Sequence, residues 1–263
     1  MDPFDRQKRI QGWKQDLIDE AVAVCFGVGG LGSVVSMNLC RMGVGRIILI
    51  DKDIVEIHNL NRQLLFSMKD VGRPKVTAAK EALELGHNIR SQIEEHQIDI
   101  VEKWSDVIRI IQGATVIFNM IDYGDYFDYA AQSLAIKLGI PLIQGGTFAQ
   151  SMCVEYITAR GQPCLLCGSD NAREEIIDQI RPEEILELEN LNFLPKNSNP
   201  IGQSNTYLCG TCGMLMTAKY GEGIINSEDA QISNRTLFYV NTMESVNFGI
   251  EPKIGCKFCK YDA

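Results

Sequence analysis

A buried strand, a glycine-rich turn and a helix follow one another near the start of the chain, and this succession constrains the fold most. Apolar residues at 21–26 predict the strand. Residues 27–33 (Gly-Val-Gly-Gly-Leu-Gly-Ser) then turn the chain into a helix that we expect to reach about Met42. A second apolar strand at 46–50 ends on Asp51. Two parallel strands joined by a helix form a βαβ unit, so the chain is predicted to be α/β, with a Rossmann-like, doubly wound, largely parallel sheet.

The glycine turn predicts a nucleotide site. Glycines let the backbone approach a phosphate, and the helix N-terminus supplies free N–H groups. Gly27, Gly29 and Gly32 form a G-x-G-x-x-G pattern, with Gly30 inside it. Asp51 lies nineteen positions after Gly32 and suits a ribose hydroxyl. Alone, the pattern also fits an NAD-dependent dehydrogenase, or a turn that only packs a helix on a strand.

The residues that follow the second strand favour ATP over NAD. A dinucleotide site has no use for the polar groups that come next, which are Asp53, Asn59, Asn61, Arg62 and Gln63. Arg62 offers a planar fork of donors to phosphate oxygens, and Lys75 adds a compact charge near a predicted helix start. Asp122 ends another predicted strand and could hold Mg²⁺ beside phosphates.

The remaining elements predict one continuous sheet. The expected elements of the first half are helices at about 75–88 and 126–138 and strands at 115–121 and 141–143. Past Gly145 the pattern changes to antiparallel strands at 151–159 and 236–248, with a helix at about 213–220. We therefore expect a single domain rather than two.

Four of the nine cysteines predict a structural zinc site. Cys164-x-x-Cys167 and Cys256-x-x-Cys259 together have the spacing of a closed, tetrahedral four-thiolate site. A third pair, Cys209 and Cys212, precedes the helix expected at 213–220, where the helix dipole would lower a thiol pKa. That pair could be nucleophilic or redox-labile, although we favour a packing role for it as small hydrophobic residues.

The bulk composition excludes several function classes. The chain has 263 residues, with 45% hydrophobic and 22% charged residues, and its net charge is −9. The negative charge disfavours a nucleic-acid partner. No apolar stretch reaches the length of a membrane span, and the chain opens without a signal-peptide core, so we expect a cytoplasmic protein with reduced thiols.

The complete string of motifs resembles the ubiquitin-activating-enzyme superfamily, most closely its compact ThiF/MoeB/HesA branch. The resemblance covers nearly the whole chain. It implies adenylation of the C-terminal carboxylate of a small ubiquitin-like or sulfur-carrier protein ending in Gly-Gly, with ATP, Mg²⁺ and structural Zn²⁺, in a homodimer. It also implies a nucleotide-binding half at 1–145 and a carrier-binding and zinc half at 146–263, with a crossover loop at about 171–206.

The resemblance also implies roles for the candidate residues. The Gly29–Gly32 turn would contact the nucleotide, Asp51 the ribose, and Asp122 the Mg²⁺. The residues expected to bind phosphates are Asn59, Arg62, Gln63 and Lys75. Arg6 matches an arginine that the family supplies to the partner subunit's active site. Asp122 is followed by two further acids, Asp125 and Asp128, where many relatives have an asparagine and an arginine, which puts substrate selection in question.

Three other functions stay open. The same site could adenylate a peptide or a modified tRNA nucleoside. The chain could also be a catalytically silent partner of an active relative, although the set of Arg62, Lys75 and Asp122 argues against that. A dehydrogenase comes last, because nothing after Asp51 predicts a nicotinamide pocket.

Overall fold

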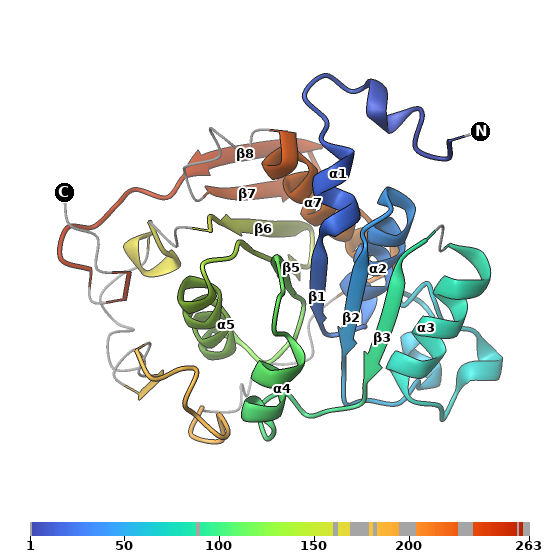
Figure 1. The fold of residues 1–263 in the computed structure, drawn as a ribbon, viewed down its shortest axis with the longest axis horizontal. Coiled ribbons are helices and arrows are strands. Elements are labelled where there is room, and N and C mark those ends of the chain that lie inside the picture. Colours follow the sequence, from blue (N-terminus) through green and yellow to red (C-terminus); the bar gives the residue numbers. More distant parts are fainter. Residues whose placement is uncertain are drawn as a thin grey trace.

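The computed structural model describes residues 2–87, 90–159, 163–168, 179–180, 183–194, 204–225, 234–256 and 258–259. Within these ranges a single eight-stranded sheet forms the centre of the molecule, with the strand order β3-β2-β1-β4-β5-β6-β7-β8 (Figure 1). One continuous sheet was the expectation from the sequence, and it is confirmed.

The first five strands are parallel and carry the buried apolar segments. They are β1 (Val22–Phe26), β2 (Arg46–Ile50), β3 (Gln92–His96), β4 (Val116–Asn119) and β5 (Leu142–Phe148). The strand order reverses between β1 and β4. Strands β2 and β3 lie on one side of β1, whereas β4 and β5 lie on its other side. Ligands of such sheets bind at the carboxyl ends of the strands beside this reversal.

The last three strands are antiparallel. They are β6 (Ser151–Ile157), β7 (Asn234–Tyr239) and β8 (Glu244–Gly249). The sequence predicted antiparallel strands at 151–159 and 236–248, and the second of these is a hairpin of two strands, because residues 240–243 turn the chain back.

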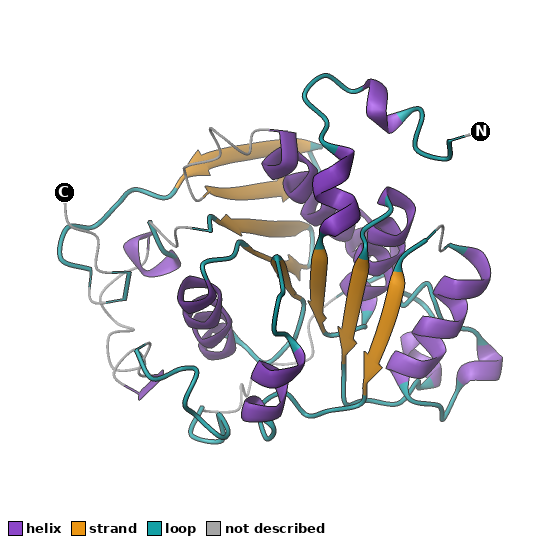
Figure 2. Ribbon diagram, viewed as in Figure 1, coloured by secondary structure: helices purple, strands orange, loops and turns teal. Residues whose placement is uncertain are grey.

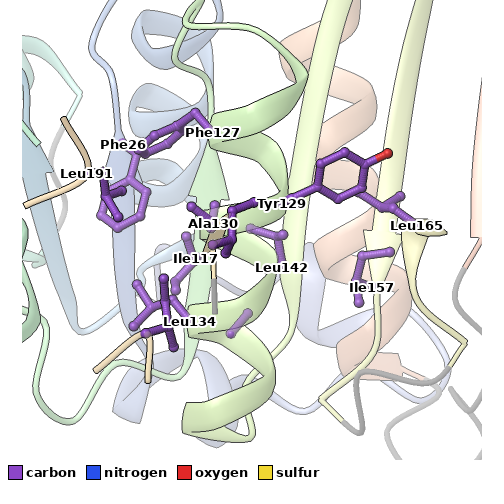
Figure 3. Close-up of a cluster of buried hydrophobic side chains, with 14 of the residues drawn as sticks. Phe26, Ile117, Phe127, Tyr129, Ala130, Leu134, Leu142, Ile157, Leu165 and Leu191 are labelled. Carbon is purple, nitrogen blue, oxygen red and sulfur yellow. The ribbon is translucent and has the colours of Figure 1, made fainter. Parts of the chain in front are cut away.

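Helices cover both faces of the sheet (Figure 2). The apolar residues of α2 (Gly30–Met42), α3 (Lys75–Gly86) and α7 (Thr206–Ile225) share one hydrophobic core with the short α1 (Gln15–Glu20). The other face is covered by α4 (Trp104–Ile110) and α5 (Asp125–Leu138), whose side chains form a second core with residues from β1, β4, β5 and β6 (Figure 3). Short 3-10 helices are η1 (Gln7–Arg9), η2 (Ile57–Asn59), η3 (Met68–Asp70) and η4 (Leu165–Gly168).

Several predicted boundaries differ from the structure. The helix expected at about 213–220 begins at Thr206 and ends at Ile225, since Cys209 and Gly213 pack closely against α2 rather than breaking the helix. The strand expected at 115–121 ends at Asn119. Strand β3 was not anticipated, because its sequence, Gln-Ile-Glu-Glu-His, is polar and lies at the sheet edge. The crossover segment at about 171–206 lies mostly outside the described residues.

No helix among the described residues combines the length and the apolar character that a membrane span requires.

Candidate functional site

The glycine turn lies at the carboxyl end of β1 and is held by its own backbone. Gly27 has a φ of +90°, and its N–H donates to the Ile50 carbonyl at 2.9 Å. A Cβ at Gly32 would lie 2.2 Å from the Gly27 carbonyl oxygen. The turn is therefore closed to any side chain at position 32, and α2 begins directly above it with its first N–H groups unpaired within the helix.

Asp51 is fixed against this turn. Its Oδ2 accepts a hydrogen bond from the Val28 N–H at 2.7 Å, and its Oδ1 accepts one from the Asp53 N–H at 2.9 Å. Burial raises the pKa of the Asp51 carboxyl above its ordinary value, although the nearby Lys75 ammonium opposes that shift. The carboxylate thus lies beside the glycine turn, as expected for a group that meets a ribose.

Lys75 is the one candidate cation whose side chain is almost fully enclosed, with 8% exposure. Its Nζ donates to Asp53 Oδ2 at 2.9 Å, and its backbone N–H donates to the Asp53 carbonyl at 2.9 Å. Pro74 precedes it as the N-cap of α3, so the helix start fixes the lysine in place. The ammonium has three donors, so besides its bond to Asp53 it can donate to a phosphate that enters next to it.

The segment at 56–63 lies alongside the glycine turn. Asn59 is buried, and its Oδ1 accepts from the Glu56 N–H at 3.0 Å as part of a capping box, so this oxygen shapes the segment itself. Gln63 is buried, and its Nε2 lies 3.6 Å from the Cβ position of Gly29. Gln63 Oε1 has no hydrogen-bond partner within the described parts of the chain. Arg62 donates to the His58 carbonyl at 2.8 Å and to Asn61 Oδ1 at 3.0 Å, and its Cγ lies 3.6 Å from the Cβ position of Gly30.

Asp122 completes the carboxyl edge of the sheet from the β4 side. The Met120 carbonyl lies 3.0 Å from the Cβ position of Gly27, so the residues after β4 adjoin the turn. Asp122 itself is exposed. Of the two further acids, Asp128 is turned back toward the sheet, because its Oδ1 accepts from Asn119 Nδ2 at 2.7 Å.

Arg6 lies at the opposite end of the sheet from these residues. The Phe4 ring covers Gly43 at the end of α2, and Gln7 Nε2 donates to the Met42 carbonyl at 2.8 Å. Figure 1 shows this N-terminal segment where β1, β2 and β3 begin. The thirteen residues of α2 span about 20 Å, so Arg6 does not reach the glycine turn of its own chain.

The four predicted zinc ligands come together. Their sulfur atoms all lie within 4.8 Å of one another, and three Sγ–Sγ distances are 3.8, 3.6 and 3.7 Å, for Cys164–Cys167, Cys164–Cys256 and Cys167–Cys259. A zinc ion bound at about 2.3 Å by four thiolates separates the sulfurs by about 3.8 Å. The donor set therefore fits a structural zinc ion, which would tie Cys256 and Cys259 to the cysteines at and just before η4.

The structure corrects the prediction for the third cysteine pair. Cys209 and Cys212 lie inside α7 rather than before it, and both are buried. Burial raises the pKa of both thiols, that of Cys212 to about 12, so the expected lowering by a helix dipole was wrong. Cys209 Sγ lies 2.5 Å from the Cβ position of Gly30, and Cys212 Sγ lies 3.1 Å from that of Gly145. Both thiols pack α7 closely onto α2 and β5, as the favoured interpretation held.

The sequence analysis missed one group of polar residues on neighbouring strands of the sheet. Gln144, Glu155 and Arg235 are joined by hydrogen bonds on β5, β6 and β7. The available signal was a glutamine within an otherwise apolar strand, Leu-Ile-Gln-Gly-Gly.

The chain that carries the glycine turn, the acid and the buried lysine matches a known family over most of its length. The profile of the ThiF family matches residues 4–255. The chain belongs to the ThiF family. The recognition made from the motifs is thereby confirmed.

Relatives with established names cover only part of this chain. It is 30% identical over 160 residues to the sulfur carrier protein adenylyltransferase of Thermus thermophilus, covering 58% of this chain and 57% of that protein. It is 31% identical over 160 residues to the sulfur carrier protein ThiS adenylyltransferase of Bacillus subtilis, covering 59% of this chain and 46% of that one. The chain thus matches about half the length of these relatives.

Solved structures share the fold over a longer span. The crystal structure of Escherichia coli MccB in complex with a form of MccA has a TM-score of 0.76 and 21% identity, covering 98% of this chain and 75% of that one. The structure of MccB with ATP has a TM-score of 0.72 and 22% identity, covering 93% of this chain and 68% of that one. These likenesses establish the shared fold.

Proposed function

We propose that this protein uses ATP to adenylate the C-terminal carboxylate of a small ubiquitin-like or sulfur-carrier protein, with release of pyrophosphate. The observation that carries the proposal is the convergence of Asp51, Lys75 and the glycine turn at one edge of the sheet. Family membership supports it, since relatives in that family are named adenylyltransferases.

The residues present fit a bound nucleotide. Four of the seven residues of the turn are glycines without side chains, and α2 begins there, so its N–H groups would meet the phosphates. Asp51 would bind the ribose hydroxyls. Among the described residues Gln63 Oε1 has no hydrogen-bond partner, and this acceptor beside the turn suits a donor on the nucleotide.

The reaction requires cancellation of charge more than proton transfer. A carboxylate is already ionised at neutral pH, and it must approach the α-phosphate of a triphosphate that repels it. Lys75 and Arg62 would neutralise the phosphates, and the fixed site would hold the carboxylate in line with the leaving pyrophosphate. Asp122 is the residue that would hold Mg²⁺ beside the phosphates, where the ion supplies further positive charge.

Arg6 would act in a second copy of the chain. It lies about one α2 length from the glycine turn of its own subunit. We therefore propose a homodimer in which each Arg6 enters the site of the other subunit. Within one subunit, residues 1–145 would bind the nucleotide and residues 146–263 would bind the carrier and zinc.

A peptide is the second candidate substrate. The fold likeness to MccB extends over 98% of this chain, and MccB has been crystallised with MccA. Adenylation of a peptide carboxylate would use the same phosphate site, so only the substrate distinguishes the two proposals.

The test is exchange of radiolabelled pyrophosphate into ATP. The reactions offer, one at a time, Bacillus subtilis ThiS, other carriers ending in Gly-Gly, and N-formylated MccA. The variants are Lys75→Met and Asp122→Asn, and Lys52→Met serves as the control because Lys52 is exposed and pairs with Asp99.

We expect exchange that depends on a carrier and falls at least about 10²-fold in Lys75→Met and Asp122→Asn, the usual effect of removing one charge-stabilising group. Lys52→Met should resemble the wild type. Exchange with MccA alone would replace the carrier by a peptide. Binding of ATP without exchange for any acceptor would contradict the adenylation proposal and favour a silent subunit.

A further inference from the structure

A row of polar residues crosses the sheet beside the candidate nucleotide site. Asn119 is in register with Gln144, Gln144 with Glu155, and Glu155 with Arg235. Residues paired in register project from the same face, so the four side chains leave the sheet on the side that α5 covers. We call these four residues the polar row.

Hydrogen bonds connect the outer part of the row. Gln144 Nε2 donates to Glu155 Oε2 at 2.7 Å, and Arg235 Nε donates to Glu155 Oε1 at 2.5 Å. At the inner end, Asn119 Nδ2 donates to Asp128 Oδ1 on α5. Both oxygens of Glu155 are occupied, and its carboxylate fixes the orientation of its two neighbours.

These hydrogen bonds do not involve Oε1 of Gln144. The residue is 5% exposed, and its Oε1 has no hydrogen-bond partner in the described ranges of the chain. Its amide cannot be reversed, because Glu155 Oε2 accepts only a donor, which must be Nε2. A buried acceptor without a partner is rare in folded proteins and calls for an explanation.

The row begins at the nucleotide site and leads away from it. Asn119 is in register with Phe26, the residue before Gly27 of the glycine turn. Adjacent strands lie about 4.8 Å apart, which places Gln144 about 10 Å from β1 and Arg235 about 19 Å from it. An extended peptide rises about 3.4 Å per residue, so Gln144 is about three residues away from a carboxylate that reacts at the turn.

We propose that the polar row binds the extended C-terminal tail of the substrate, with Gln144 Oε1 accepting a hydrogen bond from a peptide N–H within the last three residues. This inference rests on the proposed adenylation function and specifies its substrate as an extended peptide chain. A nucleoside offers no such backbone donor along the row.

The charges of the row also select the tail. Asp128 and Glu155 carry two negative charges in and beside the row, and Arg235 carries one positive charge that Glu155 already holds. An acidic side chain in the last three residues of a tail would meet this net negative charge. The row therefore disfavours acidic residues there.

The test compares Gln144→Met with Gln132→Met. Methionine keeps the length of glutamine and removes its hydrogen-bonding groups. Gln132 is the matched control because it is also buried, and it also has one atom without a partner within the described segments, whereas its Oε1 accepts from the Leu165 N–H near the zinc ligands. Neither substitution touches a residue assigned to ATP.

The probe is Bacillus subtilis ThiS with a Gly-Gly end, prepared by ligation with sarcosine in turn at each of its last three positions. Sarcosine replaces a peptide N–H by N–CH₃. In pyrophosphate exchange with the wild type, we expect one position at which sarcosine raises the KM for ThiS about tenfold, or about 1.4 kcal/mol. Gln144→Met should raise the KM similarly and lose its sensitivity to that sarcosine, while its Kd for Mg·ATP stays unchanged.

Gln132→Met should retain the wild-type KM and the wild-type sensitivity to sarcosine. If sarcosine at every position changed the KM of the wild type and of Gln144→Met equally, the assignment of Gln144 would be overturned. A wild-type KM in Gln144→Met would also overturn it. A weaker Mg·ATP affinity in Gln144→Met would also overturn it, since the effect would then be structural.

Direct binding separates this inference from the proposed function. A fluorescent peptide with the last ten residues of the probe is titrated into each protein in the presence of Mg²⁺ and a non-hydrolysable ATP analogue. If exchange is absent but the peptide binds about tenfold more weakly to Gln144→Met, adenylation of ThiS fails and the role of the row stands. If the peptide does not bind, or if it binds the wild type and Gln144→Met with equal affinity, the role of the row fails.

Discussion

The closure of the glycine turn predicts that Gly32→Ala damages both stability and ATP binding. The new Cβ would lie 2.2 Å from the Gly27 carbonyl oxygen, and a relaxed contact needs about 3.2 Å. The turn and α2 must therefore separate by about 1 Å. Such overpacking costs about 1–3 kcal/mol, against which alanine in a helix gains up to about 1 kcal/mol over glycine.

Gly210→Ala is the matched control for this substitution. Gly210 also lies near the start of a helix, and nothing lies within 4 Å of its Cβ position. It should gain the full helix preference, about 0.5–1 kcal/mol, without any clash. The two variants should therefore differ by about 1–3 kcal/mol, or roughly 2–12 °C in melting temperature for a chain of this size.

The assay combines thermal unfolding with calorimetric titration of Mg·ATP. Because a 1 Å displacement moves the N–H groups that would meet the phosphates, Gly32→Ala should lose at least about tenfold in affinity for Mg·ATP. Gly210→Ala should bind as the wild type does. Equal melting temperatures for the two variants would refute the steric argument, and a wild-type affinity in Gly32→Ala would refute the placement of the phosphates at this turn.

Three further predictions concern the metal, Asp51 and Arg6. The purified protein should contain about one zinc ion per chain by mass spectrometry. Cys256→Ser should lose the zinc and melt at a lower temperature. The control Cys153→Ala should keep the zinc, because the Cys153 sulfur lies outside the cluster. The pKa of Asp51 is raised by burial, so its protonated form favours the folded state, and this contribution is present below pH 3.8 and lost as the pH rises through the folded-state pKa. The stability of Asp51→Asn relative to the wild type, from urea unfolding between pH 4 and 7, should therefore shift in favour of the variant as the pH rises, and a flat difference would contradict the shifted pKa. Finally, Arg6→Ala and Lys75→Met should each be inactive, yet subunit exchange between them should restore about a quarter of wild-type activity, because half of the dimers are mixed and each has one complete site; no recovery would exclude action across subunits.

The sequence predicted those parts of the fold in which the local pattern and the tertiary environment agree. The strand before Gly27, the helix after it and the strand before Asp51 were placed within a residue or two, because both strands are buried on two faces and read as continuous apolar runs. The polar edge strand β3 was missed for the converse reason, since only one of its five residues is buried.

Helix α7 shows why the second half was harder to predict. Its sequence from Thr206 to Ile225 contains four glycines, which have the poorest helix preference after proline. Gly213 has no room for a side chain, because its Cβ position lies 2.7 Å from Val34 on α2. Close packing between helices thus overrides local preference, and a single sequence does not reveal the neighbour that makes the glycines favourable.

The candidate site divides in the same way. Asp51, Lys75 and the glycines were predictable because their spacing along the chain already implies a shared location at the strand ends. Gln144, Glu155 and Arg235 were not, because they meet only through the register of three strands, and the last pairing joins residues eighty positions apart in the chain. A polar residue inside an apolar strand is the one local trace of such a group.

The strand order explains how both proposed groups would serve one site. Ligands bind where the strand order of a parallel sheet reverses. Here that point lies between β1 and β4, and the glycine turn and Asp122 flank it. On one side, β2 and α3 supply the acid and the lysine that suit a ribose and phosphates. On the other side, β5 is shared between the parallel and antiparallel halves, so a chain leaving the reversal point crosses directly onto β6 and β7. The tail would thus reach the α-phosphorus from the β5 side, and an in-line displacement requires the leaving pyrophosphate to lie on the opposite side of that phosphorus atom from the attacking carboxylate.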